Sequence, residues 1–352
     1  MTDPVLVSEL NARFSASCTH DVVEAAERAW NRELWEGVLA DGFATVGVPE
    51  DGGGSGGSAV EACAVLRAAG AYAVPLPLAE SGLLAGWLVA GTGPLPRGIV
   101  TIAPRRRPVP ATAAGAGQAV LAGEVRGVPW AREADHIAVL VDAPRPAIAL
   151  APRDLVAVAE AANLAGEPRD TVRFTDAPIP VRELSLDASP AELFRLGGLS
   201  RAALISGAIE RMAALTLRYT SERCQFGRPI GRFQAVQQHL VTLAEASALT
   251  RMAVDSAAIA VASGGGEYEI AAAKTVANRG AAMAAKAAHQ AHGAMGMTRE
   301  YPLHHLSRRL WSWSAEYGNE GYWTRTLGAV ANTVGADGLY PLITDLRRAA
   351  LP

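Results

Sequence analysis

Aromatic residues and cysteines are scarce in this sequence of 352 residues, and neither sign of charge is in large excess. Only 6% of the residues are aromatic although half are hydrophobic, and the abundant alanine favours closely packed helices. The formal charge is −3 without an extended basic stripe, which argues against nucleic acid as a partner. Glycines and prolines interrupt the most apolar stretch, around residues 83–100, so we expect no membrane span.

Cysteine is limited to Cys18, Cys63 and Cys224, an odd and scattered set. None of the three has the spacing of metal ligands, and we expect no metal site. Such a set is typical of reduced thiols in a cytoplasmic protein. The first residues lack a basic segment followed by an apolar run, so we expect no secretion signal.

Three segments differ in their patterns and together predict an α+β protein. Residues 1–92 carry apolar side chains at helical spacing and predict an N-terminal helical domain. The glycine cluster at residues 51–57 lacks the Lys-Ser/Thr pair of a phosphate-binding loop, which favours a turn between helices. Residues 186–352 predict a C-terminal four-helix bundle, because short loops separate long helical patterns. Three of these helices are expected over about residues 190–223, 233–261 and 268–291.

The middle segment, residues 93–185, predicts a small antiparallel β-barrel or sandwich. It contains short runs rich in β-forming residues, separated by Pro, Gly and Asp. The runs lie at residues 99–102, 119–121, 136–141, 147–150, 155–158 and 171–174. The two prolines of residues 178–181 predict a linker to the C-terminal helices.

Two stretches of the C-terminal segment have the chemistry to bind a dinucleotide. They read RCQFGRPIGRFQAVQQH over residues 223–239 and QAHGAMGMTREYP over residues 290–302. A guanidinium such as that of Arg223 suits a pyrophosphate, and the ring of Phe226 suits an adenine or ribose face. Glutamines bond with either polarity, and glycines allow close backbone approach. Taken singly, each residue also fits a helix cap or a tight turn.

Both stretches, in this order within a helical, β, helical chain, resemble the FAD-dependent acyl-CoA dehydrogenases. In that family the Arg-x-x-Phe-Gly segment reaches across a subunit interface to the neighbour's FAD, and the Gln-x-x-Gly-x-x-Gly loop contacts the adenine end. Carried over by motif, the resemblance assigns FAD binding to Arg223, Gln225, Phe226, Gln234, Gln290, Gly293 and Gly296. Ala294 stands where the family usually has a second glycine. The resemblance also implies a dimer or tetramer, and Trp130 matches a tryptophan that flanks the flavin.

The resemblance implies α,β-dehydrogenation of an acyl-CoA in lipid metabolism such as β-oxidation. A base removes a proton, hydride passes to flavin N5, and an electron-transfer flavoprotein or a similar acceptor takes the electrons. The family's base is a Glu at one of two places, which here hold Tyr317-Gly318 and Gly197-Gly198. Glu316, one residue before the first place, is the candidate catalytic residue. The alternative is that Glu316 has no catalytic role and is an exposed carboxylate paired with Arg308 or Arg309.

Residues 101–108 lack the Gly-Ser of the family's flavin-facing loop, a second departure from its pattern. The two departures together leave three functions open. The chain is an FAD-dependent acyl-CoA dehydrogenase, or a non-catalytic subunit completing the FAD site of a homologous partner in a heterotetramer, or a flavin monooxygenase or nitroalkane oxidase of the same fold. Acyl chain length and steroid character of the substrate do not follow from the sequence.

Overall fold

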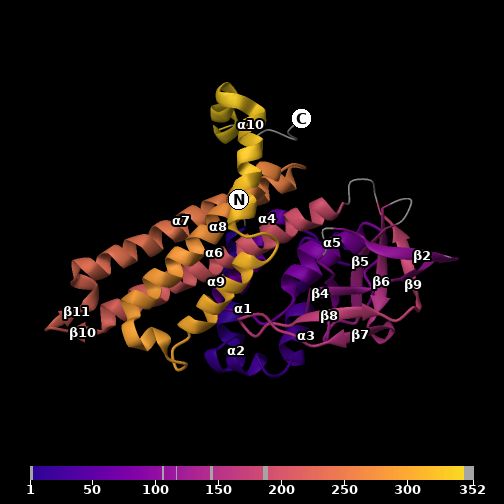
Figure 1. The fold of residues 1–352 in the computed structure, drawn as a ribbon. Coiled ribbons are helices and arrows are strands. Elements are labelled where there is room, and N and C mark those ends of the chain that lie inside the picture. The colour runs from indigo at the N-terminus through magenta and orange to yellow at the C-terminus, as the bar shows by residue number, and fades with distance from the viewer. Residues whose placement is uncertain (1–2, 105–106, 116, 143–145, 185–188, 345–352) are drawn as a thin grey trace. The chain divides into compact units, whose positions relative to one another are not determined.

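The computed structural model describes residues 3–104, 107–115, 117–142, 146–184 and 189–344 (Figure 1). By its internal contacts the chain divides into two compact units. The first comprises residues 1–25, 63–74 and 198–352, and the second comprises residues 26–62 and 75–197. Each unit is described by itself.

The first unit is helical. Its helices are α1 (Pro4–Ser17), most of α2 (His20–Ala26), most of α4 (Ala59–Ala71), most of α6 (Pro190–Glu222), α7 (Gln234–Ala262), α8 (Glu267–His292), α9 (Leu303–Ala315) and α10 (Glu320–Thr344). Asp3 begins α1 by accepting a hydrogen bond from the Val5 amide, and Pro4 occupies the first helical position, where no amide donor is needed. In α10 the backbone is non-helical at Gly335.

Close packing of α7 against α8 depends on small residues. The α8 side that is buried consists mostly of alanine, as the composition predicts. At Gly280 a Cβ atom would lie 2.9 Å from Oγ1 of Thr250 in α7, so only glycine fits without a shift. The two helices are antiparallel, since a turn of only four residues, 263–266, joins them.

The second unit contains strands β1 to β9 and several short helices. The helices are α3 (Arg32–Ala40), the π-helical turn η3 (Glu80–Leu84) and α5 (Ala85–Ala90). The strands are β1 (Val100–Ile102), β2 (Val109–Gly115), β3 (Gln118–Leu121), β4 (Glu124–Pro129), β5 (His136–Asp142), β6 (Ala147–Pro152), β7 (Val156–Ala159), β8 (Arg169–Phe174) and β9 (Pro178–Glu183). A separate three-stranded sheet has the order β4-β8-β7.

The larger sheet closes on itself. The pairings β5–β2, β2–β3, β3–β9, β9–β6 and β6–β5 form a circuit, and β1 pairs with the start of β5. Aliphatic side chains from both sheets, among them Val109, Leu121 and Ile137, form one buried cluster. The prediction of a purely antiparallel barrel is wrong, because β1–β5 and β2–β5 are parallel. The middle of the chain is therefore a mixed sheet closed into a barrel.

Residues 178–181, predicted as a linker, form most of strand β9 instead. β9 pairs with β3 through residues 178–180 and with β6 through residues 181–183. Ile179 lies buried in the core, and this burial outweighs the lost amide donors of Pro178 and Pro180.

Helices come first along the chain, strands follow between residues 100 and 183, and helices resume at residue 190. Helices α6, α7 and α8 lie within about two residues of their predicted bounds. The domain bounds at 92/93 and 185/186 stay predictions, and the second falls outside the described residues. Among the described residues, no helix combines the length and apolar character needed to cross a membrane.

Candidate functional site

The first predicted stretch forms a hairpin between α6 and α7. Strand β10 (Cys224–Gln225) pairs with β11 (Arg228–Pro229), and the Ile230 amide donates to the Arg223 carbonyl at 2.8 Å. The two turn residues, Phe226 and Gly227, have φ of 52° and 79°, which is the geometry of a type I′ turn. Glycine adopts this geometry freely, whereas a phenylalanine there is strained.

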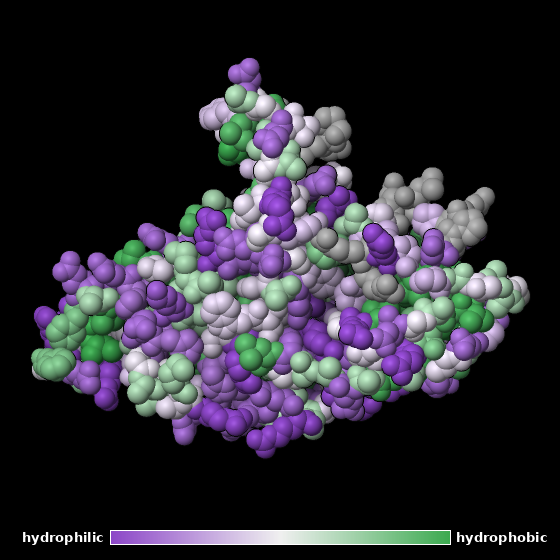
Figure 2. All heavy atoms as spheres, viewed as in Figure 1, coloured by the Kyte–Doolittle hydropathy of each residue, from purple (hydrophilic) through white to green (hydrophobic). Residues whose placement is uncertain are grey.

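Phe226 at the tip of the hairpin is 91% exposed. Its ring lies edge-on to Phe233 at 6.0 Å, and the Arg228 guanidinium lies 4.3 Å from the Phe233 ring centroid. Arg223, Gln225 and Gln234 are exposed as well. Figure 2 shows hydrophobic side chains at the end of the helices where Figure 1 places β10 and β11. A strained, exposed aromatic ring among cations indicates a surface that meets a ligand or another chain.

The second predicted stretch lies at the same end of the helical unit. Since α7 and α8 are antiparallel, the C-terminus of α8 returns to the N-terminus of α7, which directly follows the hairpin. Gln290 is exposed in the last turn of α8. The structure thus brings both stretches to one end of the helical unit (Figure 1).

Gly293 and Gly296 differ in what they require. Gly293 has φ of 60°, and nothing lies within 4 Å of the position of a Cβ, so a ligand can approach this backbone. Gly296 is buried in the 3₁₀ turn η6 (Gly293–Met297), where a Cβ would lie 2.9 Å from that of His292. Packing alone therefore accounts for Gly296.

A cluster of three rings under this loop did not emerge from the sequence pattern. His292 is buried and stacks on Tyr219 at 4.5 Å, and Tyr301 lies 4.8 Å from it. Its Nδ1 donates to the Ala288 carbonyl at 2.8 Å, and within the described part of the chain its Nε2 has no hydrogen-bond partner. Burial lowers the pKa of His292, which favours the neutral ring, and the Nδ1 hydrogen bond leaves the lone pair of that form at Nε2. The signal available in the sequence was that His292 and Tyr301 both lie inside the second stretch.

The residues at this end fit a flavin dinucleotide. They offer a guanidinium at a helix end, three amide side chains, open backbone at Gly293 and a buried acceptor at His292. Trp130 belongs to the second unit, where it is buried with φ of 55° and its ring lies 5.6 Å from that of Trp30. Its predicted place beside the flavin stays a prediction.

Glu316, the predicted base, follows the end of α9. Its Oε2 accepts a hydrogen bond from Nε of Arg201 at 2.6 Å, and the two side chains are 18% and 2% exposed. The alternative interpretation predicted that the Glu316 carboxylate is exposed, and this is wrong because the side chain is largely buried. It forms an ion pair with Arg201, an arginine of α6 that lies 115 positions away.

Buried hydrogen bonds hold the loop that carries Glu316. Lys274 of α8 donates to the Trp313 carbonyl at 2.7 Å and to Oδ1 of Asn278 at 2.9 Å. The indole N–H of Trp323 donates to the Tyr317 carbonyl at 2.9 Å. Burial lowers the pKa of Lys274 to about 7, although the Glu316 carboxylate partly opposes the shift. These hydrogen bonds join the loop to α8 and α10 of the helical unit.

Gly198, at the other place where the family carries a base, has no room for an acid. A Cβ there would lie 2.7 Å from Cζ2 of Trp323. The missing carboxylate at this place is thus a consequence of how Trp323 packs against α6. Of the two described acids beside Tyr317-Gly318, Glu316 is the more buried, because Glu320 forms an exposed ion pair with Arg279 at 3.0 Å.

Comparison with known proteins matches both ends of the chain to one family. Residues 7–93 match the acyl-CoA dehydrogenase N-terminal domain, and residues 191–329 match the acyl-CoA dehydrogenase C-terminal domain. The acyl-CoA dehydrogenase FadE34 of Mycobacterium tuberculosis is 30% identical over 328 residues, which cover 86% of this chain and 42% of FadE34. The chain thus spans less than half the length of that relative.

Two further proteins are similar over nearly their whole length. The acyl-CoA dehydrogenase IpdE2 of M. tuberculosis is 26% identical over 312 residues, covering 86% of this chain and 88% of IpdE2. The crystal structure of the ChsE4-ChsE5 complex from M. tuberculosis superposes with a TM-score of 0.85 at 26% identity, covering 96% of this chain and 99% of that one.

Proposed function

The chain belongs to the acyl-CoA dehydrogenase family, and from this premise we propose that it is an FAD-dependent oxidoreductase that oxidises an acyl-CoA thioester to its α,β-unsaturated form. The observation that supports this most is the end of the bundle where the exposed hairpin and the Gln290 loop meet. Its donors suit the pyrophosphate and adenine of FAD. Because the hairpin tip points away from its own chain's core, we propose that it serves the FAD of a second subunit.

In this proposal Arg223 binds the pyrophosphate, Gln234 and Gln290 hydrogen-bond to the dinucleotide, and Gln225 and Phe226 cover it. When bound, FAD supplies the acceptor for hydride. The protein must supply a base for the proton next to the thioester carbonyl. Glu316 has the carboxylate for this role, and the Arg201 guanidinium favours its ionised form. To accept a proton, Glu316 must exchange this ion pair for contact with the substrate. Electrons would leave to an electron-transfer flavoprotein or a similar acceptor.

The ion pair between Glu316 and Arg201 also favours a second candidate function. A carboxylate held by a buried guanidinium is a weak base, and Gly198 leaves no second acid. The chain would then complete the FAD site of a homologous subunit that carries the base. A complex of two proteins, ChsE4 and ChsE5, is among the similar structures.

The two functions separate when the chain is purified alone. We expect yellow protein that reduces an artificial acceptor in the presence of acyl-CoA. Glu316→Gln should lower this activity by at least about 100-fold, because a positioned base contributes about that factor or more. Glu320→Gln is the matched control, since that carboxylate forms an exposed pair, and its activity should stay unchanged. Inert protein that becomes active only with a co-expressed homologue would establish the subunit role, and equal loss in both variants would exclude Glu316 as the base.

A further inference from the structure

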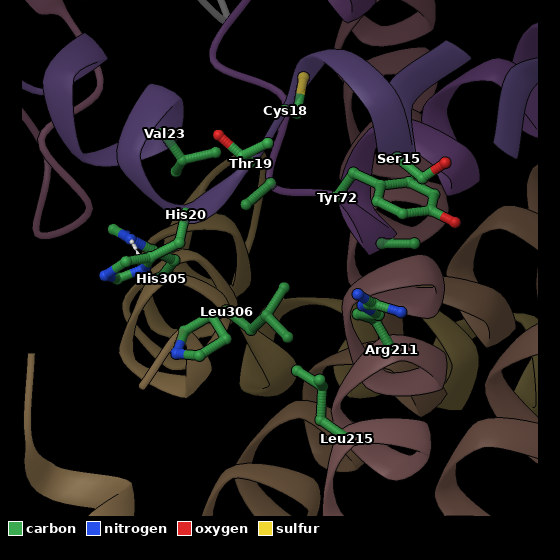
Figure 3. Close-up of a pocket in the computed structure, with 13 residues that line it drawn as sticks. Ser15, Cys18, Thr19, His20, Val23, Tyr72, Arg211, Leu215, His305 and Leu306 are labelled. Carbon is green, nitrogen blue, oxygen red and sulfur yellow. Dashed lines mark hydrogen bonds between the residues drawn. The ribbon is translucent and has the colours of Figure 1, made fainter. Parts of the chain in front are cut away.

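Three histidines of the helical unit, none of them a proposed flavin or base residue, meet between α2 and α9. His20 begins α2, and His304 and His305 lie in the first turn of α9. One ring nitrogen from each lies within 4.8 Å of the other two. His305 Nε2 is 3.1 Å from His20 Nδ1, and Figure 3 shows these two rings facing each other. Imidazole nitrogens at this spacing suit a transition metal after small ring rotations.

The remaining nitrogens of two rings have the partners that metal-binding histidines usually have. His304 Nε2 lies 3.2 Å from the Arg299 carbonyl, to which it can only donate, so its lone pair is at Nδ1. His20 Nε2 lies 3.9 Å from the Glu24 carboxylate, which favours a proton there and a lone pair at Nδ1. A carbonyl or carboxylate behind the ring fixes the tautomer and the orientation of a ligating histidine.

A cavity of about 160 Å³ lies beside the histidines. His20 and His305 form part of its wall, and Ser15, Thr19 and Tyr72 contribute hydroxyl groups elsewhere around it (Figure 3). This volume is enough for water. Water can therefore supply the fourth ligand that a tetrahedral metal requires beside three histidines.

One cation already lies against the cluster. Arg308 Nη2 is 3.4 Å from Nδ1 of both His304 and His305, so these rings present electron-rich nitrogens to a positive group. His305 is buried, and its ring lies against those of His20 and His304 at centroid distances of 4.9 and 4.0 Å. The Arg308 guanidinium repels a second cation, and a metal ion would have to displace it.

We propose that His20, His304 and His305 form a zinc site that joins α2 to α9. Nitrogen ligands alone favour zinc over magnesium or calcium. The site would connect segments 285 positions apart, which restricts the unfolded chain far more than a local contact does. This proposal does not depend on the function proposed above, because none of the three histidines is among the residues assigned to FAD or to proton transfer.

The test is zinc binding to the full chain after treatment with EDTA. Calorimetric titration with Zn²⁺ should give one site per chain, and Zn²⁺ should raise Tm by mass action. His20→Ala and His304→Ala should each weaken binding at least about tenfold, whereas His239→Ala, which removes a histidine on α7, should not change it. Arg308→Gln should tighten binding, because it removes the competing charge while keeping a polar side chain.

Two results would overturn the proposal. One is the absence of zinc binding in both the wild type and Arg308→Gln. The other is binding that His20→Ala and His304→Ala leave intact. The Tm of each variant in EDTA shows whether the variant is folded. If His20→Ala is not folded, His20→Gln is used in its place.

Discussion

Lys274 is an ammonium group buried in the core of the helical unit, where it donates to the Trp313 carbonyl behind the Glu316 loop. Its pKa is lowered from 10.5 to about 7 because burial disfavours the charged form. Between these two values the unfolded chain binds a proton that the folded chain does not. The free energy of unfolding should therefore rise as the pH rises through this window, and below it the full cost of a buried charge is present.

Replacing Lys274 with methionine tests this linkage. Urea unfolding of the wild type between about pH 7 and pH 10 should show the rise, and Lys274→Met should remove most of it. Lys286→Met changes an exposed lysine of the same helix and should keep the wild-type slope. If the free energy of unfolding depended on pH identically in all three proteins, Lys274 would have the same pKa in the folded and unfolded chains.

The Arg201–Glu316 ion pair predicts a second effect at the scale of residues. Arg201→Met leaves a largely buried carboxylate without its guanidinium and should lower the free energy of unfolding by about 3 kcal/mol. Arg279→Met breaks a pair of similar length on the surface and should change it by less than about 1 kcal/mol. Chemical denaturation of both variants compares the two values directly, and equal losses would contradict the buried pair's larger contribution.

At the scale of elements, the contact between α7 and α8 depends on one glycine. Gly280→Ala would place a methyl group 2.9 Å from Thr250 Oγ1 and 3.3 Å from Ile209 Cδ1. Steric overlap should outweigh the better helix propensity of alanine and destabilise the protein by on the order of 1 kcal/mol. Gly328→Ala in α10 meets nothing within 4 Å and should stabilise it by up to about 1 kcal/mol. Thermal unfolding of the pair should thus shift Tm in opposite directions.

Long helices could be predicted from the sequence and several strands could not. Helices α6, α7 and α8 carry many turns of apolar periodicity, so local and tertiary preferences agree. Strand β2 has little β-branched character and contains Pro110, and β9 contains two prolines. Both exist because neighbouring strands on each side complete the barrel. A pairing that depends on distant strands leaves little trace in local sequence.

At the scale of the whole molecule, some residues of the candidate site lie in local sequence motifs, whereas others depend on contacts between distant segments. Contiguous motifs carry Arg223, Phe226 and Gln290, so the sequence alone could propose them as FAD-binding residues, and this role stays a prediction. The partner of Glu316 could not be predicted, because Arg201 is 115 positions away. Likewise, His20 and His305 are 285 positions apart, and no spacing of the kind that marks short metal motifs joins them. Long-range side-chain contacts follow from tertiary packing and not from any local pattern.

The three thiols differ in a way that can be used to follow assembly. Cys63 is fully buried with its pKa raised to about 12, and burial also raises the pKa of Cys18. Cys224 is exposed on the hairpin, two residues before Phe226. Maleimide should therefore modify Cys224 first, since thiolate character and access control the reaction. Cys224→Ser should abolish the fast phase of labelling.

Because this thiol lies two residues from the hairpin tip, its alkylation rate is an intrinsic reporter of whatever covers that turn. Added FAD, or association with a second subunit, should slow modification of Cys224 in proportion to occupancy, and dilution should restore the rate. A single natural sulfur atom thus allows quaternary association to be timed without any engineered label.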